Sequence, residues 1–406
     1  MNRLLEGEVG SGKTMVATLA MFNVSLANLQ TVLMAPTEIL AAQHYKTISS
    51  LLKASGVKVA LLTRSQQKIN DQTVTNHKIL DQLLAGEIKI IVGTHALIQE
   101  RVEFKKLALA IIDEQHRFGV EQRKLLREKS GDPKITPHLL SMTATPIPRS
   151  LALTLYGDLD LSIIKEMPKE RKKVITEIVD PAKRQQTYNF IRDQIRDGRQ
   201  AFVICPLIDL SDKLGVKAVT EEYEKLTKEV FPELKIAMLH GKLKAAQKEK
   251  IMADFLAKQS DILVSTSVVE VGVDVPNASV MLIEGADRFG LAQLHQFRGR
   301  VGRSNFQSYC FLFSDNPSQK TKTRLQALIS AKDGFELAEL DLQLRGPGEI
   351  YGTVQSGLPV FRIAQLSDHE LIVKTKNAAE LVAPHLEKYP ILQEKINQLI
   401  KEVHLE

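Results

Sequence analysis

The stretch Gly7-Glu8-Val9-Gly10-Ser11-Gly12-Lys13-Thr14 stands near the start of this 406-residue chain. It fits the pattern G-x-x-x-x-G-K-[ST], a loop whose backbone N–H groups meet phosphate at the N-terminus of a helix. The apolar pair Leu4-Leu5 comes before it, as a strand would, and a helix-compatible run over residues 15–29 follows. We therefore predict a phosphate-binding loop between a strand and a helix, which is a building unit of an α/β fold with parallel sheets.

This loop predicts a nucleoside triphosphate and a metal ion as ligands. Lys13 would reach the β- and γ-phosphates of ATP, and the Thr14 hydroxyl would help to hold Mg²⁺. The residues expected to bind the nucleotide are Gly7, Gly10, Ser11, Gly12, Lys13 and Thr14. The alternative is a chance glycine-rich turn before a helix, which the strand and the helix around the loop disfavour.

Composition indicates an ordinary globular protein of about two to three domains. Hydrophobic residues make up 44% of the chain and charged residues 25%, and no apolar run approaches the roughly 18 residues of a membrane span, so we expect no membrane segment. Cys205 and Cys310 lie in strand-like apolar runs, which predicts buried free thiols in a reducing cytoplasm. The net charge of +6 is compatible with a nucleic-acid partner but too small to establish one.

Short apolar runs alternate with helix-like stretches along two consecutive segments, which predicts parallel sheets covered by helices on both faces. The predicted strands are 31–35, 57–62, 88–92, 107–112 and 139–142 in the first segment, and 174–179, 201–205, 235–239, 262–264, 280–283 and 308–313 in the second. We place the first lobe at residues 1–165, a charged linker at 166–173 and the second lobe at 174–318. Residues 319–406 are expected to be mostly helical, interrupted by a loop over 345–352 and by a break near Pro390.

Asp113-Glu114-Gln115-His116 comes directly after the predicted strand 107–112. A carboxylate at the carboxyl end of a parallel strand lies beside the phosphate-binding loop in this type of fold. We expect Asp113 to hold Mg²⁺ through water, and Glu114 to orient and polarise the attacking water. The alternative is an acidic pair that caps the following helix, which the presence of the loop makes the weaker interpretation.

In the stretch Gln296-Phe-Arg-Gly-Arg-Val-Gly-Arg303, arginines alternate with glycines. The guanidinium groups therefore stand on a backbone that approaches another surface closely. In an ATPase of two lobes, such arginines reach across the cleft and stabilise the charge of the transition state. We assign this role to Arg300 and Arg303, and we expect Gln296 to sense the nucleotide. The alternative is a basic patch that contacts a phosphate backbone or solvent.

Small polar residues follow several other predicted strands. They include Thr37, Thr94, His95, Ser265 and Thr266, with Ser141-Met-Thr-Ala-Thr-Pro146 as a candidate relay between the γ-phosphate and the second lobe. Hydroxyls and short basic side chains at strand ends suit contacts to a nucleic-acid backbone. Each signal is weak alone, and a lone histidine such as His95 is more often structural. Together they fall on the predicted sheet edge where ligands bind.

The order of these segments resembles the motor of superfamily 2 helicases. The matching segments are Gly-Ser-Gly-Lys-Thr (10–14), Ala-Pro-Thr-Glu (35–38), Gly-Thr-His-Ala (93–96), Asp-Glu-Gln-His (113–116), Thr-Ala-Thr-Pro (143–146), Val-Gly-Val-Asp-Val-Pro (271–276) and Gln-x-x-Gly-Arg-x-Gly-Arg (296–303). More narrowly, Asp113-Glu-Gln-His-Arg-Phe-Gly119, Thr145-Pro-Ile-Pro-Arg149, Tyr156-Gly-Asp-Leu-Asp160, residues 293–300, Leu344-Arg-Gly-Pro-Gly-Glu349 and residues 352–359 resemble the RecG family of bacterial ATP-dependent DNA helicases. The resemblance extends over nearly the whole chain.

The resemblance implies two tandem RecA-like lobes and an ATP-driven motor that translocates on duplex DNA with 3′→5′ polarity. The implied substrates are branched double-stranded DNAs, namely stalled replication forks and Holliday junctions in recombination and repair. Single-strand DNA-binding protein is a further candidate partner, and the implied location is the bacterial cytoplasm. The resemblance also implies nucleotide binding by Asp274, and a helical hairpin and loop that couple hydrolysis to movement, to which Arg324, Arg345 and Gln355 correspond.

Two features of the family pattern differ here. The family carries an N-terminal wedge that recognises the branch and a glutamine segment before the loop that contacts adenine, and this sequence has neither, which predicts a truncated chain. Arg64 stands where the family usually has glycine. For Arg345, which precedes Gly-Pro-Gly, a lever tip and a structural salt bridge are equally open interpretations. The alternative functions are a translocase like the transcription-repair coupling factor, a DNA-binding remnant without a productive ATP site, and an RNA helicase.

Overall fold

A computed structural model describes most of the chain. The described residues are 1–115, 118, 125–126, 129–131, 136–144, 159–166, 172–206, 216–266, 275–302, 305–316, 318–350 and 369–402, with the backbone alone for 345–350 and for a few other helical positions. The chain divides into two compact units. One comprises Met1–Thr145 with Leu161–Ser330, and the other comprises Pro146–Asp160 with Ala331–Glu406.

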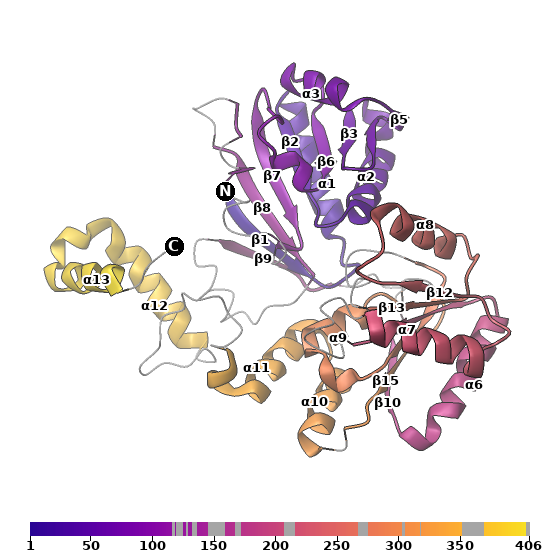
Figure 1. The fold of residues 1–406 in the computed structure, drawn as a ribbon. Coiled ribbons are helices and arrows are strands. Elements are labelled where there is room, and N and C mark those ends of the chain that lie inside the picture. The colour runs from indigo at the N-terminus through magenta and orange to yellow at the C-terminus, as the bar shows by residue number, and fades with distance from the viewer. Residues whose placement is uncertain are drawn as a thin grey trace. The chain divides into compact units, whose positions relative to one another are not determined.

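The first lobe is built on a nine-stranded sheet in the order β5-β4-β3-β6-β2-β7-β8-β1-β9 (Figure 1). Its strands are β1 (Asn2–Gly7), β2 (Gln30–Met34), β3 (Val59–Leu62), β4 (Gln67–Ile69), β5 (Gln72–Thr73), β6 (Ile90–Gly93), β7 (Leu107–Asp113), β8 (His138–Thr143) and β9 (Asp160–Ile164). Its helices are α1 (Lys13–Leu26), α2 (Glu38–Leu52) and α3 (Asn76–Leu84), with short 3₁₀ turns at Lys53–Ser55 and His95–Ile98. The run from β3 to β1 is parallel, as the sequence predicts.

Three strands of this sheet lie outside the predicted runs. β4 pairs antiparallel with β3, β5 pairs antiparallel with β4, and β9 is half-buried at the opposite edge. β4 (Gln67-Lys68-Ile69) and β5 are short and mostly polar, and polar residues interrupt β9, so none of the three has the continuous apolar run that marks a parallel strand with both faces covered. Their pairing depends on the neighbouring strand, which a local pattern does not contain.

The central strands of the first lobe are buried on both faces. On one face they pack with α1 and α2, through residues such as Met21, Tyr45 and Ile48. On the other face they pack with α3, through Ile79 and Leu83. Fully burying one such side chain stabilises the fold by about 1.5–3 kcal/mol. Burial on both faces explains why these strands read as continuous apolar runs.

The second lobe contains a six-stranded sheet in the order β10-β15-β14-β11-β13-β12, and its paired strands are parallel. Its strands are β10 (Ile175–Val179), β11 (Gln200–Ile204), β12 (Ile236–Leu239), β13 (Ile262–Ser265), β14 (Ala278–Ile283) and β15 (Tyr309–Phe313). Its helices are α6 (Arg184–Arg196), α7 (Val216–Lys225), α8 (Ala245–Leu256), α9 (Leu291–Arg298) and α10 (Gln319–Ser330), with short turns η4 (Pro181–Lys183), η5 (Leu226–Val230) and η7 (Ala286–Arg288). Every strand predicted for this lobe is present, within two residues at each end.

The described part of the second unit is mainly helical. Its helices are α11 (Gly334–Ile350), α12 (His369–Val382), the 3₁₀ segment η8 (Ala383–Lys388) and α13 (Pro390–Glu402). The predicted break near Pro390 is confirmed, because α13 begins there. The loop predicted from residue 345 was placed too early, because α11 continues to Ile350. The helix continues although Pro347 lacks a backbone N–H and costs about 3 kcal/mol in a helix interior, and nothing in the structure explains this.

A buried glutamine begins the second strand of each lobe. Gln30 Nε2 donates to the carbonyls of Leu83 (2.8 Å) and Ile88 (3.0 Å), and Gln30 Oε1 accepts from the backbone N–H of Lys106 (2.9 Å). These partners lie at the end of α3, before β6 and before β7. One side chain therefore ties three loops to the start of β2.

Gln200 repeats this arrangement in the second lobe. Its Nε2 donates to the carbonyls of Phe255 and Ser260 (both 2.7 Å), and its Oε1 accepts from Asn277 Nδ2 (3.2 Å). These partners lie near the end of α8, before β13 and before β14, which are the topological equivalents of the partners of Gln30. The two lobes thus share a structural device as well as an architecture. Among the helices of the described ranges, none is both long and apolar enough to cross a bilayer.

Candidate functional site

The predicted phosphate-binding loop connects β1, which ends at Gly7, to α1, which begins at Lys13. Gly12 is the N-cap residue of α1 and has φ 93° and ψ 14°, a left-handed conformation that favours glycine. At Gly7 the restriction is space, because a Cβ atom there would lie 2.5 Å from Ser11 Oγ. Gly12 is therefore favoured by its backbone conformation, and Gly7 by the lack of space for a side chain in the turn.

The side chains of the loop are arranged around its backbone. Lys13 Nζ donates to the carbonyls of Gly7 (2.7 Å) and Glu8 (2.9 Å), so the ammonium group lies over the loop. The buried Oγ of Ser11 has no hydrogen-bond partner in the described part of the chain. Such an unsatisfied hydroxyl beside a helix N-terminus and an ammonium group fits an anionic ligand such as a phosphate.

Asp113 and Glu114 lie at the carboxyl end of β7. The sheet places β7, β8 and β1 side by side and parallel, so this end shares one edge with the phosphate-binding loop. Both residues are buried, and Glu114 has φ 53°, which turns the chain sharply after the strand. A non-glycine residue in this conformation is uncommon and is typical of functional sites.

The two carboxyl groups have different electrostatic environments. Burial by itself raises the pKa of Asp113, but the hydrogen bond from His44, the charges of His44 and Lys13 and the backbone N–H of Glu114 outweigh it, so this pKa lies below its usual value. Burial and the negative charge of Asp113 raise the pKa of Glu114 to about 7, although Arg300 and Lys13 oppose that rise. Asp113 is thus kept charged, while the pKa of its neighbour Glu114 lies near 7, a division typical of catalytic sites.

This arrangement fits the metal that the sequence predicts. Mg²⁺ is usually held by one or two carboxylates together with phosphate oxygens and water, and not by a cage of protein ligands. The described residues contain no group of three or more histidine, cysteine, aspartate or glutamate side chains that could hold a metal by themselves. A charged Asp113 and the Thr14 hydroxyl on the first turn of α1 match a Mg²⁺ site in which phosphate oxygens and water complete the coordination.

The helix α9 brings the predicted arginine segment to the loop. A Cβ atom on Gly299, next to the end of α9, would lie 3.2 Å from Val9 Cγ2, and His295 Nε2 lies 3.8 Å from Glu8 Oε1. Gln296 and Arg300 are both buried. Since the charges of Arg300, Lys13 and Asp113 act on Glu114, the structure gathers these four residues around one place, with Gln296 on α9 four residues before Arg300.

The candidate DNA-contacting residues lie at strand ends, as predicted, and several also have structural roles. Thr37 is the N-cap of α2, where its Oγ1 accepts from the N–H of Leu40. Thr94 is buried, and His95 stacks on Phe118 with ring centroids 5.0 Å apart. In the second lobe Ser265 and Thr266 are buried, and Ser265 Oγ donates to the Thr266 carbonyl.

Arg324 and Arg298 connect α10 with the segment that carries the arginine motif. Arg324 Nη2 donates to the carbonyl of Asp287 in η7, just before α9. In the opposite direction, Arg298 Nη1 donates to the carbonyl of Leu328 in α10 (2.7 Å). Ser314 Oγ in turn donates to Asp287 Oδ1 (2.6 Å). The two arginines therefore attach α10 to both ends of the α9 segment.

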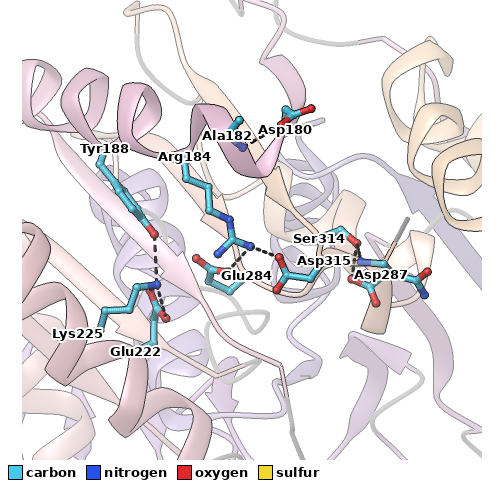
Figure 2. A network of polar contacts seen from close by, with 11 residues as sticks. Asp180, Ala182, Arg184, Tyr188, Glu222, Lys225, Glu284, Asp287, Ser314 and Asp315 are labelled. Atoms are coloured by element: carbon cyan, nitrogen blue, oxygen red, sulfur yellow. Dashed lines mark hydrogen bonds and ion pairs between the residues drawn. The ribbon is translucent and has the colours of Figure 1, made fainter. Parts of the chain in front are cut away.

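Figure 2 shows a polar network at the carboxyl end of the second sheet that the sequence motifs do not mark. Arg184 donates to Asp315 Oδ1 (2.8 Å), lies 3.8 Å from Glu284 Oε2 and stacks on the ring of Phe313. Burial, together with the charge of Glu222, raises the pKa of Glu284 to about 7. The network therefore includes a carboxyl group that titrates near neutrality.

Lys225 extends this network to the next helix. Its Nζ donates to Glu222 Oε1 (3.1 Å) and to Tyr188 Oη (3.4 Å). Since its charged groups are paired with one another, we assign the network the structural role of fixing α6 and α7 against the ends of β14 and β15.

Four of the predicted site positions fall outside the described structure. They are Asp274, Arg303 and Gln355, and the side chain of Arg345, whose backbone belongs to α11. His116 and residues 145–146 of the candidate relay segment are also outside it, while Ser141 and Thr143 are buried in β8.

His44 and Glu6 are functional-site neighbours that sequence reasoning missed. His44 Nε2 lies 2.7 Å from Asp113 Oδ2, and Glu6 is fully buried immediately before the loop. A single polar residue on the buried face of an amphipathic helix is the signal that could have identified His44. For Glu6 the signal is an acidic residue inside an apolar strand.

Comparison with protein families identifies the class. Residues 1–154 match the DEAD/DEAH box helicase family, and residues 182–305 match the helicase conserved C-terminal domain. The fold and the site therefore define a two-lobed, RecA-like motor domain of the helicase class. Residues 331–403 match the C-terminal part of domain 3 of the ATP-dependent DNA helicase RecG.

Individual relatives specify the family. The chain is 49% identical over 98% of its length to the ATP-dependent DNA helicase RecG of Synechocystis, and 50% identical over 99% to that of Aquifex aeolicus. The chain belongs to the RecG family. It spans 47% and 50% of the length of these two relatives, so it corresponds to about half of each.

Solved structures agree with this assignment. A structure described as RecG bound to a three-way DNA junction has a TM-score of 0.73 and 45% sequence identity, and the match covers 92% of this chain and 47% of that one. The yeast protein Dbp5, solved with RNA and ADP BeF3, has a TM-score of 0.59 at 17% identity over 85% of this chain and 88% of its own. The second likeness concerns the fold alone. The predicted fold class, two RecA-like lobes followed by a helical region, is confirmed.

Proposed function

We propose that this chain is an ATP-driven DNA motor of the RecG type, which hydrolyses ATP and remodels branched DNA. The observation that carries the proposal is the meeting of Lys13, Asp113 and Glu114 at one sheet edge, in a chain about half identical to RecG helicases. A loop that binds phosphates next to one charged carboxylate and one carboxylate near neutrality suits phosphoryl transfer to water.

The residues divide the chemistry among them. The loop residues and Asp274 bind the nucleotide, and Thr14 and Asp113 hold Mg²⁺, which when bound neutralises charge on the phosphates. Glu114 orients and polarises the attacking water, as its pKa near 7 suits a group that accepts a proton. Arg300 and Arg303 stabilise the charge that develops on the phosphate, and Gln296 senses the nucleotide.

Branched double-stranded DNA is the proposed substrate class, with stalled forks and Holliday junctions as examples and 3′→5′ as the polarity. The similar RecG structure is described as bound to a three-way junction, which supports this choice. Thr37, Thr94, His95, Ser265 and Thr266 are the proposed backbone contacts. We also propose single-strand DNA-binding protein as a partner and the bacterial cytoplasm as the location, because the relatives of known source are bacterial DNA helicases.

Coupling of hydrolysis to movement is assigned to Arg324, Arg345 and Gln355. The hydrogen bond from Arg324 to the Asp287 carbonyl supports this assignment, because it ties α10 to the segment that leads into α9. We propose the domain boundaries 1–165, 166–173, 174–318 and 319–406. The match of residues 331–403 to RecG favours this family over the coupling factor and the RNA helicase, and the presence of Lys13, Asp113 and Glu114 disfavours the inactive remnant.

ATP turnover by the purified chain, with and without a synthetic forked DNA, tests the proposal. Lys13→Ala is expected to abolish hydrolysis and leave the fold intact, because Lys13 is partly exposed and contributes no core packing. Circular dichroism and thermal melting check the fold. Normal turnover in a folded Lys13→Ala protein would overturn the assignment of the loop, and absence of turnover in the unmodified chain would overturn the proposed activity.

A further inference from the structure

The carboxylate of Asp113 is held at both of its oxygens. His44 Nε2 lies 2.7 Å from Oδ2, and the backbone N–H of Glu114 donates to Oδ1 at 3.0 Å. The first of these donors comes from a residue 69 positions away in the sequence. Two donors on opposite oxygens fix the rotation of a carboxylate as well as its position.

His44 differs from its neighbours on the buried face of α2. The other buried residues of this helix are Leu40, Ala41, Tyr45, Ile48 and Leu52, and they pack against the sheet. The side chains of His44 and Asp113 are 7% and 11% exposed. A carboxylate withdrawn from water to that extent needs a donor to remain charged, and His44 is placed to supply it.

The same helix begins at the sheet edge where DNA contacts are proposed. Thr37 caps α2, and Glu38, its first residue, accepts a hydrogen bond from the N–H of Ser65 (3.1 Å). Thr37 and His44 are seven residues apart, which is about 10 Å along a helix. One continuous helix therefore carries a proposed DNA contact at its start and the partner of Asp113 two turns later.

We infer that His44 is a positioning residue that holds Asp113 in the orientation required to bind Mg²⁺ with the nucleotide. It does so from α2, so the helix whose start carries a proposed DNA contact is tied through His44 to the metal-binding carboxylate at the end of β7. This inference rests on the proposed function, since it concerns the same nucleotide site. Partners that orient a metal ligand from behind commonly change metal affinity by about 10–100-fold when removed.

The test compares His44→Gln, whose amide nitrogen reaches as far as Nε2, with His44→Asn, which is too short, and His44→Leu, which has no donor. Equilibrium binding of a fluorescent ADP is measured with Mg²⁺ and with a chelator, so no turnover is needed. We expect the Leu and Asn variants to lose at least about tenfold in affinity with Mg²⁺ and little in the chelator, and the Gln variant to stay within about threefold. His77→Leu, at an exposed histidine paired with Asp81, is the matched control.

Three results would overturn the inference. These are unchanged Mg²⁺-dependent affinity in folded Leu and Asn variants, equal losses with Mg²⁺ and with the chelator, or an Asn variant that behaves like Gln. If the Leu variant fails to fold, the comparison of Gln with Asn decides. In an Asp113→Asn background, His44→Asn should have no further effect on the Mg²⁺-dependent affinity. Failure of the proposed motor function is recognised separately, as absence of ATP turnover in the unmodified chain.

Discussion

Glu6 is a fully buried carboxyl group in β1, opposite Thr143 of β8. Within the described residues neither of its oxygens has a hydrogen-bond partner. Burial raises its pKa to about 7. The folded state therefore binds a proton on Glu6 at a pH where the unfolded chain has released it. The charge appears only at a cost to stability, because a buried ion without a partner is destabilising.

A pH dependence of stability follows from Glu6. Because its folded pKa lies above its unfolded value, the contribution is fully present below about pH 4.5 and is lost as the pH rises to about 7. Glu6→Gln removes the titrating proton and keeps the shape of the side chain. We expect the free energy of unfolding of this variant to fall less than that of the unmodified protein between about pH 5 and pH 8, by an amount on the order of 1–3 kcal/mol.

Thermal melts across this pH range measure the difference. Glu177→Gln, at an exposed glutamate on β10, is the control and should follow the unmodified protein. Parallel pH profiles for Glu6→Gln and the unmodified protein would show that Glu6 does not titrate between the two conditions. The raised pKa values of Glu114 and Glu284 add a slope of the same sign, which the variant retains.

At the scale of elements, the two glutamines at the starts of β2 and β11 show how loops are fixed around each sheet. Each side chain donates to two carbonyls and accepts from one donor at the ends of helices and strands. Buried backbone groups need such partners, because an unsatisfied one costs about 1–3 kcal/mol. A glutamine offers both a donor pair and an acceptor on one planar group, so it suits a junction of three loops.

Gln200→Leu is expected to destabilise the second lobe. The leucine fills a similar volume but leaves the Ser260 carbonyl without its side-chain donor, whereas the Phe255 carbonyl keeps the N–H of Lys258 (3.0 Å). We therefore expect a loss of about 1–3 kcal/mol and a fall in melting temperature of roughly 2–12 °C. Gln186→Leu, at an exposed position of α6, is the matched control. A melting temperature of Gln200→Leu equal to that of the control would mean that water replaces the glutamine at little cost.

At the scale of the whole molecule, the proposed motor depends on a link between the nucleotide edge and α10, the last helix of the second lobe. Two hydrogen bonds on α10 attach it to the α9 segment, which carries Gln296 and leads to Arg300. A change in α9 on nucleotide binding would therefore move α10 with it. The family resemblance assigns the next step to Arg345 and Gln355.

Arg345→Ala is expected to uncouple the motor. We predict that ATP turnover on forked DNA stays within about threefold while branch unwinding falls by roughly tenfold or more, because the substitution affects transmission and not the nucleotide site. Turnover and unwinding are measured on the same forked substrate. Arg196→Ala, at an exposed arginine of α6, controls for loss of a surface charge. A parallel loss of both activities would show that Arg345 does not act in coupling.

The sequence by itself determined which segments carry the candidate site residues and at which strand ends they lie. The phosphate-binding loop, the Asp113–Glu114 pair and the arginine segment are local patterns, and their positions at strand ends follow from apolar runs that a parallel sheet imposes. The same kind of apolar run predicted all six strands of the second lobe. Local patterns suffice here because strands covered on both faces must be apolar throughout. They failed for β4, β5 and β9, whose pairing comes from neighbours.

Only the tertiary structure decided which distant residues share an environment. His44 meets Asp113 across 69 residues because α2 packs over β3 and β6, on the sheet whose carboxyl edge carries Asp113, and no spacing in the sequence expresses that contact. Glu6 is withdrawn from water because other strands flank β1 on both sides. The paired Gln30 and Gln200 are equivalent only through topology. Charge, burial and hydrogen bonding depend on neighbours in space, whereas strand and loop propensities depend on neighbours along the chain.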